Sequence, residues 1–167
     1  MKQVPKIRAM TTEDPSVFCP ELFRLLSNCG IALILLPHIG GSFLHGATFY
    51  DKNKIVIGLT LRGKDADKFW FSLFHEIGHI LLGHLNQETE IDDNAEAAAD
   101  QYARDTLIDP SMFQSFTNQG IFTKDAILTF SESIGIDPGI LVGRLQKEGY
   151  IEFSWHNDLK TKYELTA

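Results

Sequence analysis

The chain has 167 residues, of which 44% are hydrophobic and 22% are charged, and its formal net charge is −7 at pH 7. This length fits one domain with a substantial hydrophobic core, and the acidic balance argues against a general binder of nucleic acid or anionic membranes. Two cysteines are too few for a disulfide framework, and no segment has the pattern of a signal peptide or a membrane span, so we expect a cytoplasmic protein.

The first part of the chain predicts a small sheet preceded by one helix. Residues 1–15 are mixed in character and contain prolines, so we expect an N-terminal arm. Apolar residues at helical spacing then predict a helix, and β-rich runs separated by turn residues predict strands. The expected elements are a helix over 20–29 ended by Gly30, a buried strand over 31–36, and a hairpin of strands over 43–50 and 54–60.

From residue 65 onward the apolar spacing is helical. The expected helices cover 65–84, about 92–108 with a stop at Asp109-Pro110, 123–133 and 137–149, followed by a final turn over 157–163. This order predicts an α+β fold in which helices pack on a small antiparallel or mixed sheet. We expect residues 16–167 to form a single domain, with a helical C-terminal part over about 111–167.

The most informative stretch is His75-Glu76-Ile77-Gly78-His79, an H-E-x-x-H pattern inside an apolar helical segment. Positions i and i+4 lie on one face of a helix, so His75 and His79 are placed to bind one metal ion. Glu76 lies about 100° further round the helix, close enough to act on a water proton without binding the metal. The alternative is a core helix with two satisfied histidines, but a buried helix rarely carries such polar groups unless something satisfies them. The pattern predicts a zinc site.

A catalytic zinc ion usually has three protein ligands, so a third is expected beyond the motif. His84 is poorly placed, because on a continuous helix it points about 140° away from His79, and we expect it to be a polar residue at the helix C-terminus. Glu96 is the better candidate. Alanines around it let its helix approach the first one closely, and Asp100 on the same face can accept the second ring N–H of a ligand histidine. The alternative for Glu96 is an ordinary acidic helix N-terminus favoured by the helix dipole.

These residues also resemble a known family. His75-Glu-Ile-Gly-His79, then Glu96-x-x-Ala99-Asp100-x-Tyr102-Ala103 and Leu107-Ile108-Asp109-Pro110, are similar to the pattern of ImmA/IrrE-type zinc metallopeptidases, which is H-E-x-x-H, E-x-x-A-N/D-x-F-A and an L-L/I-x-P close. Segments 59–62, 69–71 and 135–146 resemble the branch found at the C-terminus of HigA-like, helix-turn-helix antitoxin proteins. The resemblance covers about residues 43–163 and departs from the pattern at Asp100, where many members have Asn. No helix-turn-helix precedes the domain here, so we expect a stand-alone member or a piece of a longer protein.

The resemblance implies a zincin-like fold with His75, His79 and Glu96 as Zn²⁺ ligands and Glu76 as general base. It implies a zinc metallo-endopeptidase of the gluzincin type that hydrolyses a peptide bond. The implied partner is a protein substrate, a transcriptional repressor or antitoxin-type regulator, with no direct nucleic acid and no membrane. An oxyanion-stabilising donor is also expected, and the sequence gives no basis for choosing among the candidates Tyr102, His38, His45 and His156.

Two other functions stay open at the level of sequence. One is a zinc-containing sensor or interaction module of a toxin–antitoxin or transcriptional regulatory system, because motif residues alone do not establish proteolysis. The other is DNA binding through residues 123–147, which have the spacing of a helix-turn-helix with Gly135 in the turn. Only Lys124, Arg144 and Lys147 are basic there, so a helical hairpin packed on the core or facing a partner protein is favoured.

Overall fold

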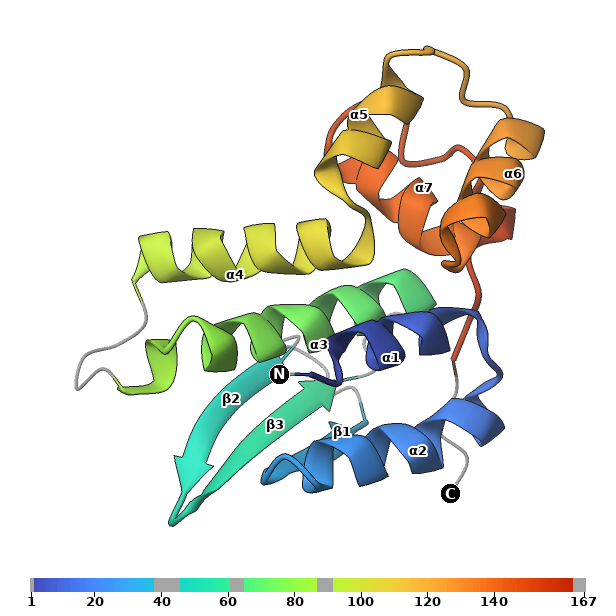
Figure 1. The fold of residues 1–167 in the computed structure, drawn as a ribbon. Coiled ribbons are helices and arrows are strands. Elements are labelled where there is room, and N and C mark those ends of the chain that lie inside the picture. Colours follow the sequence, from blue (N-terminus) through green and yellow to red (C-terminus); the bar gives the residue numbers. More distant parts are fainter. Residues whose placement is uncertain (1, 38–45, 61–64, 87–91, 164–167) are drawn as a thin grey trace.

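The computed structural model describes residues 2–37, 46–60, 65–86 and 92–163. Its architecture is α+β: helix α3 (Ala66–Leu81) lies over a three-stranded sheet, helix α4 (Asp93–Leu107) runs beside α3, and the remaining helices pack around them (Figure 1). The expected fold class is therefore confirmed. One cluster of buried side chains extends from Ile7 to Tyr163, so the described chain shares a single core.

The sheet is mixed. Its strands are β1 (Ile31–Leu36), β2 (Gly46–Asp51) and β3 (Lys54–Thr60), and β3 lies in the centre, parallel to β1 and antiparallel to β2. The predicted hairpin is confirmed, although residues 43–45 of its first strand lie outside the described residues. Strand β2 is an edge strand, and it packs against α3. This places residues of β2 close to the H-E-x-x-H motif.

Small residues allow α3 and α4 to approach closely, as the alanines around Glu96 predict. Ala95, Ala99 and Ala103 of α4 are buried, and a Cβ atom at Gly78 of α3 would lie 3.3 Å from the Ala99 Cα atom. The opposite side of α3 is anchored in the core by large apolar residues, including Trp70 and Phe74, both 0% exposed. The two helices that carry the candidate ligands are therefore held at short range.

The C-terminal part is helical, with α5 (Pro110–Thr117), α6 (Lys124–Ile134), α7 (Pro138–Lys147) and the short 3₁₀ helix η3 (Asn157–Leu159). Helix α5 is not predicted from the sequence, because Asp109-Pro110 is interpreted there only as the end of the preceding helix. The same pair starts α5, because the Asp109 side chain accepts hydrogen bonds from the backbone N–H groups of Ser111 and Met112. Helices α6 and α7 form a hairpin around Gly135 (φ 64°), and α7 packs on α3.

The prediction that residues 1–15 form an N-terminal arm is wrong. This stretch forms helix α1 (Val4–Ala9) and the 3₁₀ helix η1 (Met10–Thr12), which bury Ile7 and Met10. Arg8 donates hydrogen bonds of 2.9 Å to the backbone oxygens of Leu107 and Ile134, so α1 is tied to the ends of α4 and α6. Helix α2 (Pro15–Ser27) begins earlier than expected and packs against β1.

Among the described residues, no single helix combines the length and apolar character needed to cross a membrane. Helices α6 and α7 reach that criterion only as a pair, by length and composition, with a bend of 115° between them.

Candidate metal centre

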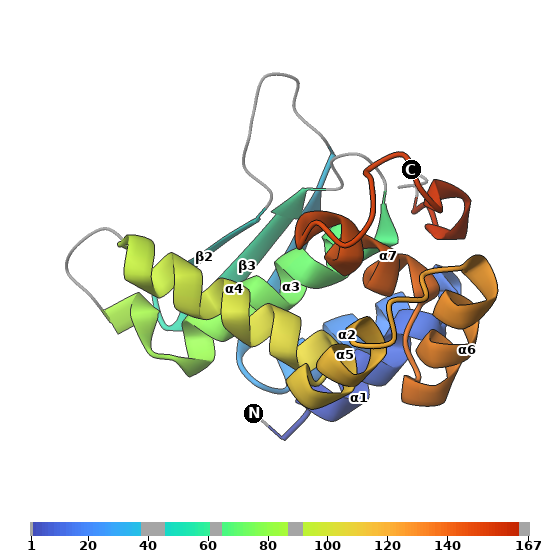
Figure 2. The same cartoon turned by 90° about the horizontal axis from the view of Figure 1, so that it is seen from above.

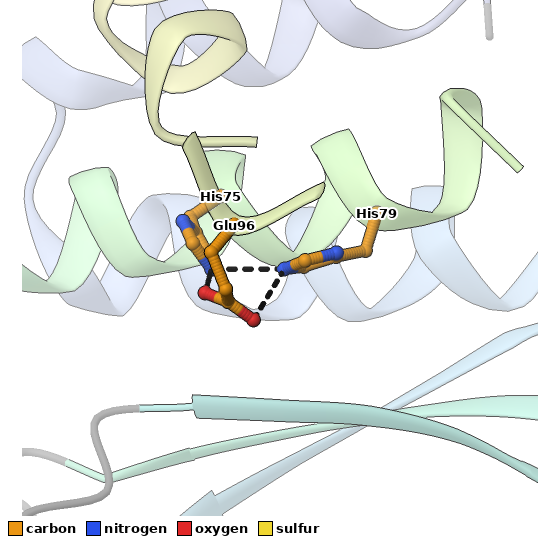
Figure 3. Close-up of side chains that lie close together, drawn as sticks. All are labelled: His75, His79 and Glu96. Carbon is orange, nitrogen blue, oxygen red and sulfur yellow. Dashed lines mark hydrogen bonds and ion pairs between the residues drawn. The ribbon is translucent and has the colours of Figure 1, made fainter. Parts of the chain in front are cut away.

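Three side chains converge between α3 and α4: His75, His79 and Glu96 (Figure 3). The Nε2 atoms of the two histidines are 3.0 Å apart. The Glu96 carboxylate oxygens lie 3.2 Å from His75 Nε2 and 3.5 Å from His79 Nε2. Ligand atoms around a tetrahedral zinc ion, with bonds of about 2.0–2.1 Å, are about 3.3 Å apart. Both the distances and the donor set, two imidazoles and a carboxylate, therefore fit a zinc ion.

Each of the two imidazoles is also held through its other ring nitrogen. His75 Nδ1 lies 2.8 Å from Asp100 Oδ1, the contact that the sequence analysis expects, and His79 Nδ1 lies 3.0 Å from His84 Nδ1. A ring nitrogen that binds a metal must be deprotonated, so each Nε2 offers a lone pair when its Nδ1–H donates a hydrogen bond. The Asp100 carboxylate accepts from Nδ1–H and so holds His75 in the tautomer suited to metal binding, and His84 Nδ1 can accept from His79 Nδ1–H in the same way.

His84 is not where a continuous helix would put it. Helix α3 ends at Leu81, Gly83 adopts a φ of 79°, and His84 opens the 3₁₀ helix η2 (His84–Asn86). The chain therefore turns back toward His79. His84 is not a member of the three-residue group, as expected from the sequence. Its contact with His79 is not predicted from the sequence. The available signal is Gly83, because a glycine in this conformation commonly ends a helix.

Glu76 is buried beside this group and is held from the sheet. It is 5% exposed, and the Thr48 hydroxyl of β2 donates a hydrogen bond of 2.5 Å to its Oε2 atom. Gly46, on the same face of β2, leaves room for the carboxylate, because a Cβ atom there would lie 2.5 Å from Glu76 Oε1. Neither Gly46 nor Thr48 is singled out by the sequence analysis. The sequence shows only that Gly46 and Thr48 are two positions apart on a predicted strand, and so on one face of it.

Burial shifts the protonation of two residues of the site. It raises the pKa of the Glu76 carboxyl, although the Thr48 hydroxyl and His75 act in the opposite direction. It also lowers the pKa of the His79 imidazole, with a smaller contribution from His75. The second shift favours the neutral imidazole, which is the form that binds metal ions.

Two of the candidates for stabilising an oxyanion, Tyr102 and His156, are among the described residues, and neither lines the pocket that contains the three-residue group. Tyr102 lines a separate hollow beside Leu82 and Thr106, and burial raises its pKa. His156 lies in the C-terminal segment, where its Nε2 atom is 2.8 Å from the Phe122 backbone oxygen. His38 and His45 lie outside the described residues.

The candidate ligands and Glu76 open into a cleft of about 1090 Å³. One end is lined by the ligand group and by Gly46, Ala47 and Thr48 of β2, and the other by the start of α3, by α7 and by the C-terminal segment. In Figure 2, α7 and the C-terminal segment (red) lie at the same end of the molecule, away from the first turns of α4. Ligand pockets for small molecules commonly enclose about 300–1,000 Å³, so this cleft lies at the upper end of that range.

No family model and no curated protein matches this chain. The function is therefore argued from the geometry of the site, together with the resemblance of its motifs.

Proposed function

We propose that the protein is a zinc-dependent metallopeptidase that hydrolyses a peptide bond within a protein substrate. The observation that carries this proposal is the convergence of His75, His79 and Glu96 within reach of one ion, with the buried carboxylate of Glu76 beside them. Three protein ligands next to a separate carboxylate are the arrangement typical of catalytic zinc sites, which leave one position for water.

The chemistry assigns one role to each group around the site. When bound, zinc supplies a Lewis acid that lowers the pKa of a water molecule and polarises the scissile carbonyl. Glu76 accepts a proton from the water as its oxygen bonds to the carbonyl carbon, and returns that proton to the amine nitrogen as the C–N bond breaks. Thr48 holds Glu76 Oε2 through its hydroxyl, which leaves Oε1 to carry the proton.

A polypeptide substrate is supported by the shape of the cleft. Its wall at the metal end includes Gly46, Ala47 and Thr48 of the edge strand β2. An edge strand offers backbone N–H and C=O groups to an additional extended chain, so a polypeptide can pair there beside Glu76. The proposal of a cytoplasmic repressor or antitoxin-type regulator as target rests on the resemblance to ImmA/IrrE-type peptidases.

Replacing Glu76 with glutamine tests the proposal. The variant should keep one zinc ion per chain, measured by elemental analysis, and lose at least about 10²-fold in the rate of cleavage of a peptide library, because the proton carrier is removed. Glu132→Gln, the same change at an exposed site on α6, serves as the control and should cleave at the wild-type rate. An active Glu76→Gln protein would rule out Glu76 as the base. Zinc binding without cleavage by the wild type would favour the zinc-containing sensor instead.

A further inference from the structure

The two ends of the cleft carry opposite charges. The end that contains the candidate metal ligands carries the carboxylates of Glu76, Glu96 and Asp100. The far end is lined by six basic side chains, namely Lys68, Arg104, Arg144, Lys147, Lys160 and Lys162, and by three acidic ones, namely Asp65, Asp67 and Glu148. The chain as a whole has a net charge of −7, so this gathering of cations runs against the overall charge.

At the start of α3 the acidic groups are buried while two of the ammonium groups are exposed. Asp65 and Asp67 are each 8% exposed. Lys68 and Lys162, which both pair with Asp65, have side chains that are 49% and 58% exposed. Lys160 is paired with Asp67 at 2.8 Å, and its side chain is only 10% exposed. A ligand that enters this end therefore meets the ammonium groups of Lys68 and Lys162 before the carboxylates.

The α7 wall adds one more available cation. Lys147 is exposed, and no ion pair to it is present among the described residues. Arg144 is already engaged, because it donates hydrogen bonds to the backbone oxygens of Arg104 and Ile108 and pairs with Glu148. Lys68 and Lys162 share the single carboxylate of Asp65, so this group keeps one positive charge, and together with Lys147 they are the cations open to a ligand.

An exposed aromatic ring stands at the same end of the cleft. Phe153 lines it and is 71% exposed. Its loop is held in place by Gln146, which is 3% exposed and donates hydrogen bonds to the backbone oxygens of Phe153 and Trp155. The backbone that carries the Phe153 ring is therefore held by hydrogen bonds.

We propose that Lys68, Lys147 and Lys162 form a subsite for an acidic side chain of the polypeptide that the metal centre cuts. This inference rests on the proposed function. Lys68 precedes His75 by seven positions on α3, a distance of about 10 Å along the helix. An extended polypeptide covers that distance in about three residues. The acidic residue therefore lies about three to four residues from the scissile bond.

Peptide binding tests the subsite without requiring turnover. Zinc-loaded Glu76→Gln protein is immobilised and exposed to a library of random dodecapeptides, and the bound peptides are sequenced. Asp and Glu should be enriched about two- to fivefold over the input, the ratio expected from exposed ion pairs. The enrichment should vanish when Lys68→Glu and Lys147→Glu are added. The matched control is Lys52→Glu with Lys54→Glu on the exposed β2–β3 hairpin, outside the cleft, which changes the net charge equally and should keep the enrichment.

Several outcomes would overturn the subsite. The first is that the parent protein does not enrich acidic peptides, and the second is that the enrichment survives Lys68→Glu and Lys147→Glu. The third is that the control variant loses the enrichment equally, which would mean that the net charge of the protein causes it. Salt-dependent binding of duplex DNA that disappears with the same two substitutions would assign these lysines to nucleic acid instead. Cleavage of the library by the wild type is read separately. If peptides with acidic residues are preferred but none is cleaved, the peptidase activity is refuted and the subsite is not. If the peptides are cleaved about three to four residues from an Asp or Glu, both proposals are supported.

Discussion

Replacing Thr48 with valine tests the environment of Glu76 most directly. Valine keeps the branched shape but removes the hydroxyl that donates to Glu76 Oε2 at 2.5 Å. Hydrogen bonds to charged groups contribute about 1.5–3 kcal/mol. Because Glu76 is only 5% exposed, water does not readily replace the lost donor. We therefore expect the free energy of unfolding of the metal-free protein to fall by about 1.5–3 kcal/mol at neutral pH.

This loss of stability depends on pH in a defined direction. Burial already raises the pKa of the Glu76 carboxyl, and losing the hydroxyl raises it further, because the hydrogen bond favours the ionised form. When the folded-state pKa is above the unfolded-state value, the ionised carboxylate costs stability at neutral pH, and this cost disappears as the pH falls through the folded-state pKa. The difference between wild type and variant should therefore be largest at neutral pH and shrink on acidification.

Urea denaturation at neutral and acidic pH, followed by tryptophan fluorescence, measures both effects. Thr48→Ser is the matched control, since it keeps a hydroxyl on the same carbon and should lose less stability than Thr48→Val. If the zinc-loaded protein cleaves peptides as proposed, Thr48→Val should lower kcat with little change in KM. A valine variant as stable as the wild type at neutral pH, or a serine variant that loses as much, would refute the role given to the hydroxyl.

The remaining predictions concern the metal centre. Glu96→Ala removes one of the three candidate ligands, so elemental analysis of the dialysed protein should find no zinc; one zinc per chain would mean that another group is the third ligand. His84→Ala should keep zinc but weaken its affinity about 10–100-fold in competition with a chelating dye, and an unchanged affinity would deny any influence of the contact with His79. Gly46→Ala places a Cβ atom 2.5 Å from Glu76 Oε1, so cleavage should drop while zinc stays bound, and normal turnover would contradict the close approach. Because burial lowers the pKa of the His79 imidazole from its ordinary value, protons should compete with zinc at this residue only at acidic pH; in a pH series of zinc titrations, an affinity that already falls as the pH is lowered from alkaline to neutral would contradict the assignment.

Elements with strong local signals are predictable from this sequence. Helices α3, α4, α6 and α7 each combine apolar spacing with a capping residue or an apolar run, and the strands are bounded by turn residues. The short helices α1 and α5, with 6 and 8 residues, are not predicted. Helix α1 depends on distant partners, such as the Leu107 and Ile134 carbonyls that Arg8 contacts. Helix α5 has a local start signal in Asp109-Pro110, but the same pair also fits the stop of the preceding helix.

Strand pairing is likewise decided by tertiary structure. Alternation and turn residues indicate where strands lie, but they do not name the partner of a strand. The sequence leaves the choice between an antiparallel and a mixed sheet open, and the parallel pairing of β1 with β3 makes it mixed. That pairing leaves β2 at the edge, beside the motif helix.

The core of the candidate site is predictable from the sequence, because helix geometry is local. A spacing of four on one helix puts His75 and His79 on one face, and the same spacing relates Glu96 to Asp100 on the next helix. Which other groups contact these residues depends on how distant segments pack together. The turn at Gly83 brings His84 to His79, and the packing of β2 on α3 brings Thr48 to Glu76. The cationic end of the cleft joins segments almost a hundred residues apart, and such contacts depend on how whole elements pack rather than on any periodicity in the chain.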